Sequence, residues 1–488
     1  QKDEWGNVIK RIDGEGNETR YTYTTGNRLT SITYPDTRID KYEYTQYGNI
    51  TKETAAQGTA EETITTYTYD TYGQLIATTK GGGVTTTYAY DNAGNITEIK
   101  DPNGNVTTMT YDNVGNLLTT TAPLIGTTTF ANHDYKGNPG KITDPNGNIM
   151  LNTYDALGRV KTITNQADNS TTEYFYTTST SCPTCGQGSV GNIDHIVLPE
   201  GNKIDYEYDN AGNLITIKDN QGNSINYAYD IKGNRIKEDI KDANGALQKA
   251  IDYQYDLLNR LTRIINPDNT FTELGYDKNG NRAAAKNPNG NLTTYAYDSM
   301  NRPIRTIQPG NTVTNYSYDK RGNLTGVIDA NNNATTYEYD NLGRNIKTVS
   351  PDTGATTYIY DANNNLTTKT DATGTTITYT YDAANRLAKI DFPTDTDIVY
   401  TYDTCINGKR RLCKMQDQSG ITDYEYTAKG QLAKETKTID TITYTTQYTY
   451  DKNSNLKSMT YPSGRVITYN YANDRAISVL NNAANLAN

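Results

Sequence analysis

The sequence predicts an all-β fold made of tandem β-hairpins. The chain is polar, with 34% hydrophobic residues and a mean hydropathy of −0.79, yet it holds 43 tyrosines among 488 residues, against 4 Phe and 1 Trp. Tyrosine and threonine favour strands, whereas disordered chains are poor in aromatic residues. A Tyr-Asp pair also recurs at a period of 21 residues. A fixed period of this length is typical of repeat architectures.

The aspartates that follow a tyrosine set the register of the repeat. Steps of 21 residues separate Asp256, Asp277, Asp298, Asp319, Asp340, Asp361, Asp382 and Asp403. The same step runs through Asp70, Asp91 and Asp112, slips by one residue at Asp134 and returns at Asp155. We therefore expect one continuous array over residues 1–488, with about 23 hairpin repeats of this period.

Each repeat contains two segments with the pattern of strands. In the unit "YSYDKRGNLTGVIDANNNATT", residues 316–336, the first such segment is "NLTGVI". The second is "ATTYEY", residues 334–339, in which tyrosine recurs at every second position. β-Branched and aromatic residues at period two indicate half-buried strands.

The turn between the paired strands carries the Tyr-Asp motif. Aspartate at the first position of a type I turn accepts hydrogen bonds from backbone N–H groups, and the residue three positions later adopts a left-handed conformation. Glycine adopts that conformation freely and asparagine next best. Where this glycine is replaced, asparagine is the usual substitute, as at Asn259, Asn301, Asn364 and Asn385. We therefore interpret the motif as a turn rather than a catalytic or metal site. Its representative residues are Asp70, Gly73, Asp91, Gly94, Asp112, Gly115, Asp209, Gly212, Asp319, Gly322, Asp340 and Gly343.

A second turn leads from one hairpin to the next. It reads "DPNGN" at residues 101–105 and 144–148, and "NPNGN" at residues 287–291. Proline fixes φ near −65° and glycine supplies a positive φ, as a tight turn requires.

These residues resemble the RHS/YD-repeat family. The resemblance rests on "YxYDxxGN/RL" followed by "DxxG", and it covers nearly the whole chain. Members of the family include bacterial Rhs toxins, wall-associated surface proteins, the shell components of insecticidal toxin complexes and the animal teneurins. The resemblance implies a long antiparallel β-strip that coils into a hollow shell or rod, and in toxin-bearing members such a shell encloses a polypeptide.

The size of the strip limits what it could enclose. With strands about 4.8 Å apart, some 46 strands would make a ribbon of roughly 220 Å, which must twist and coil. A closed sphere of that area would leave a cavity of only about 15 Å radius, too small for an ordinary folded domain. The strip is then either part of a longer shell or a narrower rod. Both ends resemble open sheet edges, which favour end-to-end stacking into a filament.

The four cysteines lie where the repeat is interrupted. Cys182 and Cys185 belong to an insertion near residues 177–205, and Cys405 and Cys413 flank an enlarged hairpin near residues 404–413. Because the second pair would face each other across the hairpin, we expect a disulfide there. A disulfide is also favoured for the first pair, with reduced thiols or a metal as alternatives. Disulfides would indicate an extracytoplasmic location.

Other candidate sites are less specific. Asn-x-Ser/Thr triplets suggest glycan attachment in a secreted protein, at Asn17, Asn49, Asn95, Asn105, Asn291, Asn315, Asn323, Asn333 and Asn365. We expect no cofactor, although calcium at the turn carboxylates stays open. His133 stands where the motif usually has tyrosine, which indicates a structural role.

Composition narrows the classes of function. A net charge of −10, without a basic cluster, argues against nucleic acid as a partner, and no apolar run is long enough to span a bilayer. No catalytic arrangement is recognised, so we expect a non-enzyme. The leading hypothesis is a secreted or surface-exposed structural scaffold that self-associates through sheet edges into a filament. The alternatives are a fragment of a toxin-encapsulating Rhs shell and a carbohydrate-binding adhesin whose sugar platform includes Tyr88 and Tyr90.

Overall fold

The protein is all-β, as the sequence predicts. The computed structural model describes residues 1–178 and 191–482, and within them 43 strands belong to one antiparallel sheet with a single 3-10 turn, η1 (Gly81–Gly83). The chain divides into two compact units. Unit 1 comprises Gln1–Val106, Gln254–Ile265 and Asn269–Thr380, and unit 2 comprises Thr107–Tyr253, Asn266–Asp268 and Tyr381–Asn488.

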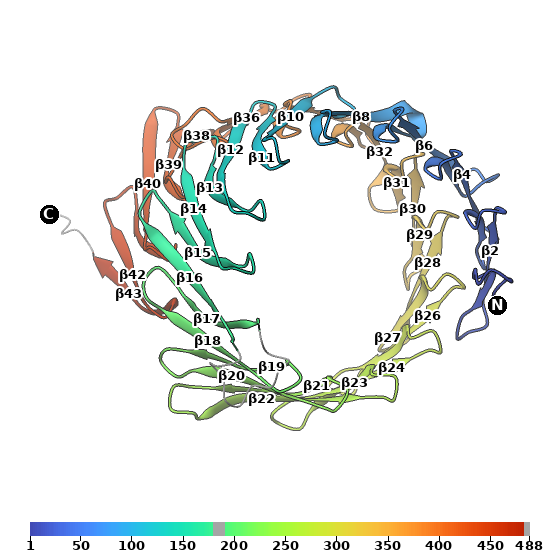
Figure 1. Ribbon diagram of the computed structural model, residues 1–488, viewed down its shortest axis with the longest axis horizontal. Helices are drawn as coiled ribbons and strands as arrows, with labels where there is room; N and C mark the ends of the chain where they lie inside the picture. Colours follow the sequence, from blue (N-terminus) through green and yellow to red (C-terminus); the bar gives the residue numbers. More distant parts are fainter. Residues whose placement is uncertain (179–190, 483–488) are drawn as a thin grey trace. The chain divides into compact units, whose positions relative to one another are not determined.

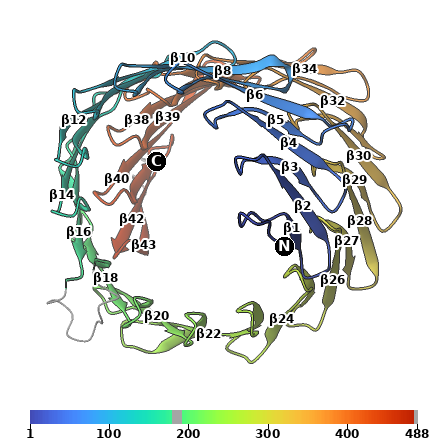
Figure 2. The ribbon, with the colours of Figure 1, turned by 45° about the vertical axis from the view of Figure 1, so that its right-hand side comes forward.

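Two sets of strands lie wholly or mainly in unit 1. They are β1 (Lys10–Ile12), β2 (Glu18–Tyr23), β3 (Leu29–Thr33), β4 (Ile39–Tyr44), β5 (Ile50–Ala55), β6 (Thr63–Tyr69), β7 (Leu75–Lys80), β8 (Val84–Tyr90), β9 (Ile96–Lys100), β23 (Leu261–Ile265), β24 (Phe271–Tyr276), β25 (Arg282–Lys286), β26 (Leu292–Tyr297), β27 (Pro303–Gln308), β28 (Thr312–Tyr318), β29 (Leu324–Ile328), β30 (Ala334–Tyr339), β31 (Asn345–Ser350), β32 (Gly354–Tyr360), β33 (Leu366–Thr370) and β34 (Thr376–Tyr381). Figures 1 and 2 show β2 to β6, in blue, beside β28 to β32, in yellow and orange.

The remaining strands lie wholly or mainly in unit 2. They are β10 (Val106–Tyr111), β11 (Leu117–Ala122), β12 (Gly126–His133), β13 (Pro139–Thr143), β14 (Ile149–Tyr154), β15 (Val160–Asn165), β16 (Ser170–Tyr176), β17 (Ile193–Val197), β18 (Lys203–Tyr208), β19 (Leu214–Asp219), β20 (Ser224–Tyr229), β21 (Arg235–Lys241), β22 (Leu247–Tyr255), β35 (Leu387–Asp391), β36 (Ile398–Tyr402), β37 (Leu412–Asp417), β38 (Gly420–Tyr426), β39 (Leu432–Ile439), β40 (Ile442–Tyr450), β41 (Leu456–Thr460), β42 (Val466–Ala472) and β43 (Arg475–Asn482). β17 lies within residues 177–205, where the sequence leads us to expect an insertion.

Two kinds of turn alternate along the sheet. The turn that follows a Tyr-Asp pair is called the YD turn, and the turn that leads to the next hairpin is called the return turn. In the hairpin β8–β9, Ala89 pairs with Glu98, whereas Tyr90 pairs with Ile96, so the register shifts at the second tyrosine. The same shift occurs in hairpin β30–β31 of unit 1 and hairpin β18–β19 of unit 2. A β-bulge therefore accompanies the YD turn in these hairpins.

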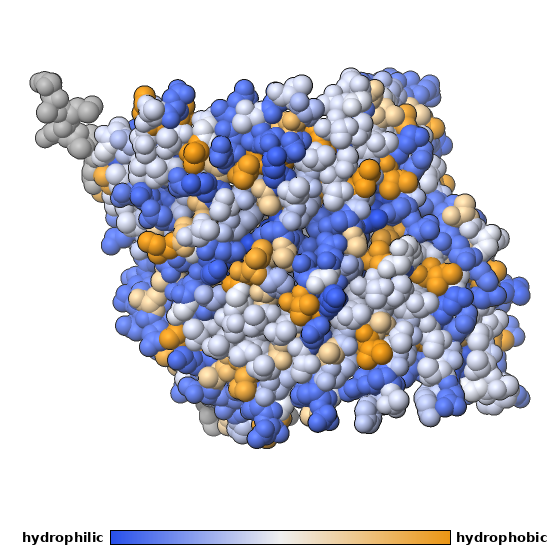
Figure 3. All heavy atoms as spheres, turned by 90° about the horizontal axis from the view of Figure 1, so that it is seen from above, coloured by the Kyte–Doolittle hydropathy of each residue, from blue (hydrophilic) through white to orange (hydrophobic). Residues whose placement is uncertain are grey.

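Few side chains are fully buried. In the part of the chain that the structure describes, the buried hydrophobic residues are Ala56, Cys413 and Ile467, and most strand residues are half-buried. Figure 3 shows apolar side chains as separate spots among polar ones on the face in view. Stability must therefore come largely from repeated local contacts between neighbouring strands, as in other repeat proteins.

Candidate functional site

The YD turn is held by a repeated set of hydrogen bonds. The N–H of Asp91 donates to the carbonyl of Asn95 at 3.0 Å, and the N–H of Gly94 donates to the carbonyl of Asp91 at 3.1 Å. Oδ1 of Asp91 accepts from the N–H groups of Ala93 and Asn95, both at 2.9 Å, and Oδ2 accepts from Nδ2 of Asn95 at 3.0 Å. Oδ1 accepts the corresponding pair of backbone N–H groups at Asp70, Asp112, Asp209, Asp319 and Asp340.

These hydrogen bonds stabilise the ionised carboxylates. Donation from the side chain and backbone of Asn95 holds the pKa of Asp91 below its ordinary value of 3.8. At Asp340, burial acts to raise the pKa, but hydrogen bonds from the backbone and guanidinium of Arg344 outweigh it and the pKa is lowered. A carboxylate that already accepts several hydrogen bonds in its ionised form is poorly suited to carry a proton in catalysis.

The fourth position of the YD turn is left-handed. Gly94 has φ of +90°, and the asparagines that replace glycine in other repeats adopt the same region. The φ values are +63° at Asn259, +61° at Asn301, +69° at Asn364 and +60° at Asn385. Positive φ values between +80° and +90° occur at Gly73, Gly115, Gly212, Gly322 and Gly343.

The second tyrosine of the motif links neighbouring strands. The hydroxyl of Tyr90 donates to the carbonyl of Leu75 at 2.8 Å, and Tyr339 donates to Leu324 at the same distance. In both cases the tyrosine reaches back across the strand pair to the first residue of the preceding strand. Burial raises the pKa of Tyr90, so the hydroxyl remains a donor at neutral pH.

The fifth turn position carries a function that our sequence analysis missed. Where it is arginine, as at Arg344, Nε donates to Oδ2 of Asp340 at 2.7 Å and a terminal nitrogen donates to the carbonyl of Asp361 in the next YD turn, also at 2.7 Å. The guanidinium lies 5.0 Å from the ring centre of Tyr360. The "N/R" alternative in the motif was the signal: both residues close their own turn and can reach the next one, arginine through a backbone carbonyl and asparagine, as at Asn281, through the side chain of Asn301.

In unit 1, turns that are remote in sequence dock on each other. The N–H of Glu15, in a return turn, donates to Oδ1 of Asn279 at 2.9 Å, and the N–H of Lys278 donates to Oε1 of Glu15 at 2.8 Å. Nδ2 of Asn279 also donates to Oδ2 of Asp13 at 2.8 Å. A Cβ on Gly14 would lie 2.1 Å from the carbonyl oxygen of Lys278, so only glycine permits this approach.

A second docked pair in unit 1 is reciprocal. Nδ2 of Asn103, in the return turn "DPNGN", donates to Oδ2 of Asp361 at 2.8 Å. In return, Nδ2 of Asn363 donates to Oδ2 of Asp101 at 2.6 Å. Each turn thus supplies one amide donor and one carboxylate acceptor.

In unit 2, Glu200 and Asn453 dock in the same way as Glu15 and Asn279 in unit 1. The N–H of Glu200 donates to Oδ1 of Asn453 at 2.9 Å, and the N–H of Lys452 donates to Oε1 of Glu200 at 2.9 Å. Nearby, Nζ of Lys429 lies 2.9 Å from Oδ2 of Asp168. Return turns from the earlier part of unit 2 therefore meet YD turns from its later part.

Three of the docked YD turns share one residue type at their third position. Asparagine stands there at Asn279, Asn363 and Asn453, and each of the three hydrogen-bonds to a return turn more than 250 residues away. In other repeats this position is apolar and exposed, as at Tyr72 and Val114, which are 89% and 82% exposed, or charged, as at Lys429, which docks on Asp168. An amide offers both donor and acceptor, which the docking contacts use.

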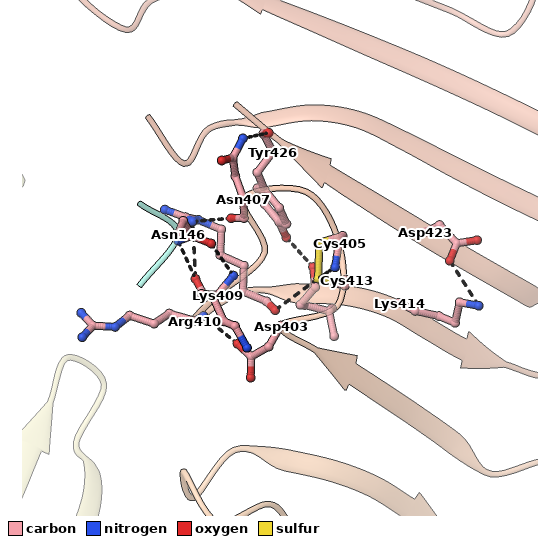
Figure 4. Close-up of a disulfide and its surroundings, with 12 residues drawn as sticks. Asn146, Asp403, Cys405, Asn407, Lys409, Arg410, Cys413, Lys414, Asp423 and Tyr426 are labelled. Carbon is pink, nitrogen blue, oxygen red and sulfur yellow. Dashed lines mark hydrogen bonds and ion pairs between the residues drawn. A yellow bond between two sulfur atoms is a disulfide. The ribbon is translucent and has the colours of Figure 1, made fainter. Parts of the chain in front are cut away.

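Cys405 and Cys413 form a disulfide in the enlarged hairpin of unit 2, with their Cα atoms 5.4 Å apart (Figure 4). The bridged loop presents Lys409, whose N–H donates to Oδ1 of Asn146 at 2.8 Å. Asn146 belongs to a "DPNGN" return turn, so the disulfide-bonded loop takes the place of a YD turn in docking. Gly408 lies against both sulfur atoms, where a Cβ would be 2.5 Å from each.

The other candidates are placed as follows. Cys182 and Cys185 lie outside the described residues. The ring of His195 stacks on Phe175 at 4.1 Å, and His133 is the last residue of β12. Within residues 1–178 and 191–482, no three or more His, Cys, Asp or Glu side chains are grouped to hold a metal ion, and no helix is long and apolar enough to cross a membrane.

Most of the candidate glycan-bearing asparagines are turn residues. Nδ2, the atom that would carry a glycan, donates to a turn carboxylate at Asn17, Asn95, Asn105, Asn323, Asn333 and Asn365. A glycan would replace one of the two hydrogens on this atom and would have to be accommodated beside the turn carboxylate. The other three candidates lie elsewhere. The backbone N–H groups of Asn49 and Asn291 donate to the first residues of their turns, Thr45 and Asn287, and Asn315 lies within β28.

Antiparallel hairpins of this period, closed by Tyr-Asp turns, define a YD-repeat array. The chain belongs to the teneurin YD-shell family, whose sequence pattern matches residues 3–187 and 215–390. The resemblance seen in the sequence is thereby confirmed.

Solved structures share the fold. The Photorhabdus luminescens Tc holotoxin pore matches with a TM-score of 0.63 at 15% identity, over 96% of this chain and 27% of that one. The crystal structure of TcdB2-TccC3-TEV matches with a TM-score of 0.60 at 15% identity, over 96% of this chain and 30% of that one. This chain thus spans less than a third of either. No curated protein matches the chain.

Proposed function

We propose that this chain is a non-enzymatic structural protein that forms part of the wall of a larger YD-repeat shell. The observation that carries the proposal is the docking of return turns on YD turns within each unit, at Glu15 with Asn279 and at Glu200 with Asn453. Such contacts join strips edge to edge, which is what a continuous wall requires. Membership of the YD-shell family and the likeness to Tc toxin structures support the same function.

The wall would act outside the cytoplasm and enclose a polypeptide supplied by the larger protein. The disulfide between Cys405 and Cys413 supports an oxidising location. Enclosure follows from the proposed shell rather than from a binding site on this chain. The filament hypothesis stays a prediction, because it requires contacts between copies, whereas the docked turns that we observe belong to one chain.

Negative-stain microscopy of the purified protein separates these functions. A shell wall is expected to give curved or closed hollow particles of uniform size. Straight, regular fibres that lengthen with protein concentration would contradict the wall and favour the filament.

A matched variant tests whether docking shapes the particle. Replacing both Glu15 and Glu200 with alanine removes one acceptor from each docking contact, while Glu4→Ala removes a glutamate from an exposed YD turn. Small-angle X-ray scattering should show a larger radius of gyration for the double variant alone. An unchanged radius in both variants would contradict the structural role of docking.

A further inference from the structure

Six asparagines of the chain are followed directly by glycine, and all six lie in turns. Glycine has no Cβ, so its backbone nitrogen can reach the side chain of the preceding residue with little steric hindrance. Attack of that nitrogen on Cγ of asparagine expels ammonia and closes a succinimide ring, which water opens to aspartate or isoaspartate. The six pairs begin at Asn103, Asn146, Asn244, Asn279, Asn289 and Asn407.

Three of these asparagines also hold docked turns together: Asn103, Asn146 and Asn279. Nδ2 of Asn279 donates to Oδ2 of Asp13 at 2.8 Å, and Oδ1 accepts from the N–H of Glu15 at 2.9 Å. Asn103 likewise donates to a carboxylate of the facing turn, and Asn146 accepts from the disulfide-bonded loop. The same amides are therefore both reactive groups and docking contacts.

Docking opposes ring closure at Asn279. To be attacked, Cγ must turn toward the nitrogen of Gly280, and the amide must then leave both Asp13 and Glu15. Because these two hydrogen bonds have to break before the ring can close, they raise the barrier to the reaction. A docked asparagine should therefore react more slowly than an undocked one.

Asn289 provides an undocked asparagine in otherwise similar surroundings. It holds the third position of a return turn, is exposed, and its side-chain amide forms no hydrogen bond within residues 1–178 and 191–482. Gly280 and Gly290 have φ of +90° and +81°. Their N–H groups donate to the first carbonyl of their own turns, at 3.2 Å and 2.9 Å. Because the attacking nitrogens are held alike, docking is the main difference between the two sites.

The product of the reaction cannot restore the docked contact. An aspartate at position 279 would place a carboxylate oxygen where Nδ2 now donates to Asp13, and two carboxylates in such close contact repel each other. Isoaspartate would in addition insert a methylene group into the main chain of the turn, directly before the left-handed Gly280. Deamidation therefore converts an attractive contact between two turns into a repulsive one.

We propose that the Asn-Gly pairs of the docked turns are deamidation sites, at which docking slows the reaction and the reaction in turn separates the docked turns irreversibly. Each event consumes one water and releases one ammonia, and it requires no oxidant or reductant. The proposal is independent of the shell function, because it depends on the docked turns alone, which a wall segment and an isolated scaffold would both contain.

Peptide mass spectrometry of the native chain during incubation in mildly alkaline buffer tests the proposal. Asn279 is expected to be converted about tenfold more slowly than Asn289. Gly14→Ala should remove this difference, because a Cβ there would lie 2.1 Å from the carbonyl oxygen of Lys278 and would force the two turns apart. Gly26→Ala is the matched control, since a Cβ there would meet only a threonine oxygen of its own turn, at 3.7 Å.

A second pair of variants tests the effect of the product. Asn279→Asp should accelerate hydrogen exchange of the Lys278 amide about tenfold, because this amide donates to Oε1 of Glu15 across the docked pair at 2.8 Å. Asn289→Asp adds the same charge to an undocked turn and should leave that amide unchanged. Equal conversion rates of Asn279 and Asn289 in the native chain would overturn the proposal, and so would equal Lys278 exchange in the two variants. Neither outcome depends on how well the Gly14→Ala variant folds.

Discussion

At the scale of the residue, the YD turn divides its work between backbone conformation and side-chain hydrogen bonds. Aspartate accepts from two backbone N–H groups, the fourth residue takes a left-handed φ, and the fifth residue closes the turn with an amide or a guanidinium. The substitution of glycine by asparagine at Asn364, with φ of +69°, preserves the conformation at the cost of a Cβ in the left-handed region.

Gly233 isolates the conformational contribution. Its φ is +84° and a Cβ there would meet nothing within 4 Å, so any cost arises from the backbone alone. Gly233→Ala should destabilise the turn by about 1 kcal/mol, and Gly233→Asn by less. Hydrogen exchange of the Asp230 amide, which donates to Asn234, should accelerate about fivefold in the alanine variant. Lys232→Ala is the control, and equal effects of Gly233→Ala and Gly233→Asn would contradict the explanation.

At the scale of the element, each hairpin forms from residues close in the sequence, whereas its turns dock on turns that are remote in the sequence. Return turns and YD turns are joined through asparagine at the third position in three docked pairs, and through Lys429 or Lys320 in two others. Because the residues in these contacts are partly exposed, each contact contributes modestly to the stability of the fold. Together they contribute more because there are several of them. The disulfide-bonded hairpin shows that a different loop can dock on the same kind of return turn, through Lys409 and Asn146.

Removing Glu15 should weaken one docked pair without disturbing its hairpin. Glu15→Ala deletes the acceptor for the Lys278 N–H, which is 2.8 Å from Oε1. The expected loss is about 1 kcal/mol, equivalent to roughly fivefold faster exchange of the Lys278 amide. The amide of Asn281 accompanies it as a local reference, because it donates to Asp277 within its own turn. If both amides accelerate equally, the effect is general unfolding and docking is not its cause.

At the scale of the whole molecule, the titratable side chains of many repeats together make the stability depend on pH. The pKa values of Asp340 and Asp361 are lowered in the folded protein: burial raises them, and hydrogen bonds from the turn residues outweigh burial. A lowered pKa contributes stability that is present above the unfolded value, near 3.8, and is lost as the pH falls through the folded value. Burial raises the pKa of Tyr42 to about 12, so its contribution is present below pH 10 and is lost as the pH rises through about 12.

Stability should therefore fall at both extremes of pH. Thermal unfolding followed by circular dichroism is expected to show a transition temperature that is constant between about pH 5 and pH 9. The transition temperature should fall below about pH 4 and above about pH 10. A transition temperature that rises as the pH falls below about 4 would contradict the stabilising role of the ionised turn carboxylates.

The sequence predicted what is local and periodic. The repeat, the hairpins, the turn aspartates and the left-handed fourth position all follow from residues within one unit of 21. The pairing of remote turns could not be predicted, because it depends on twist accumulated over more than 250 residues. Asn279, Asn363 and Asn453 carried a signal for it, since each places an amide where other repeats have apolar or charged residues. That signal could be interpreted only once the partner turns were known.

The central claim is that return turns dock on YD turns remote in sequence, and a zero-length carbodiimide cross-link tests it most directly. In the native protein, Nζ of Lys429 lies 2.9 Å from Oδ2 of Asp168, a carboxylate 261 residues away. Nζ of Lys434 lies 3.0 Å from Oε1 of Glu425 on the neighbouring strand and serves as the local control. Mass spectrometry is predicted to find both cross-links within single chains. Recovery of the Glu425–Lys434 cross-link without the Asp168–Lys429 cross-link would contradict the claim.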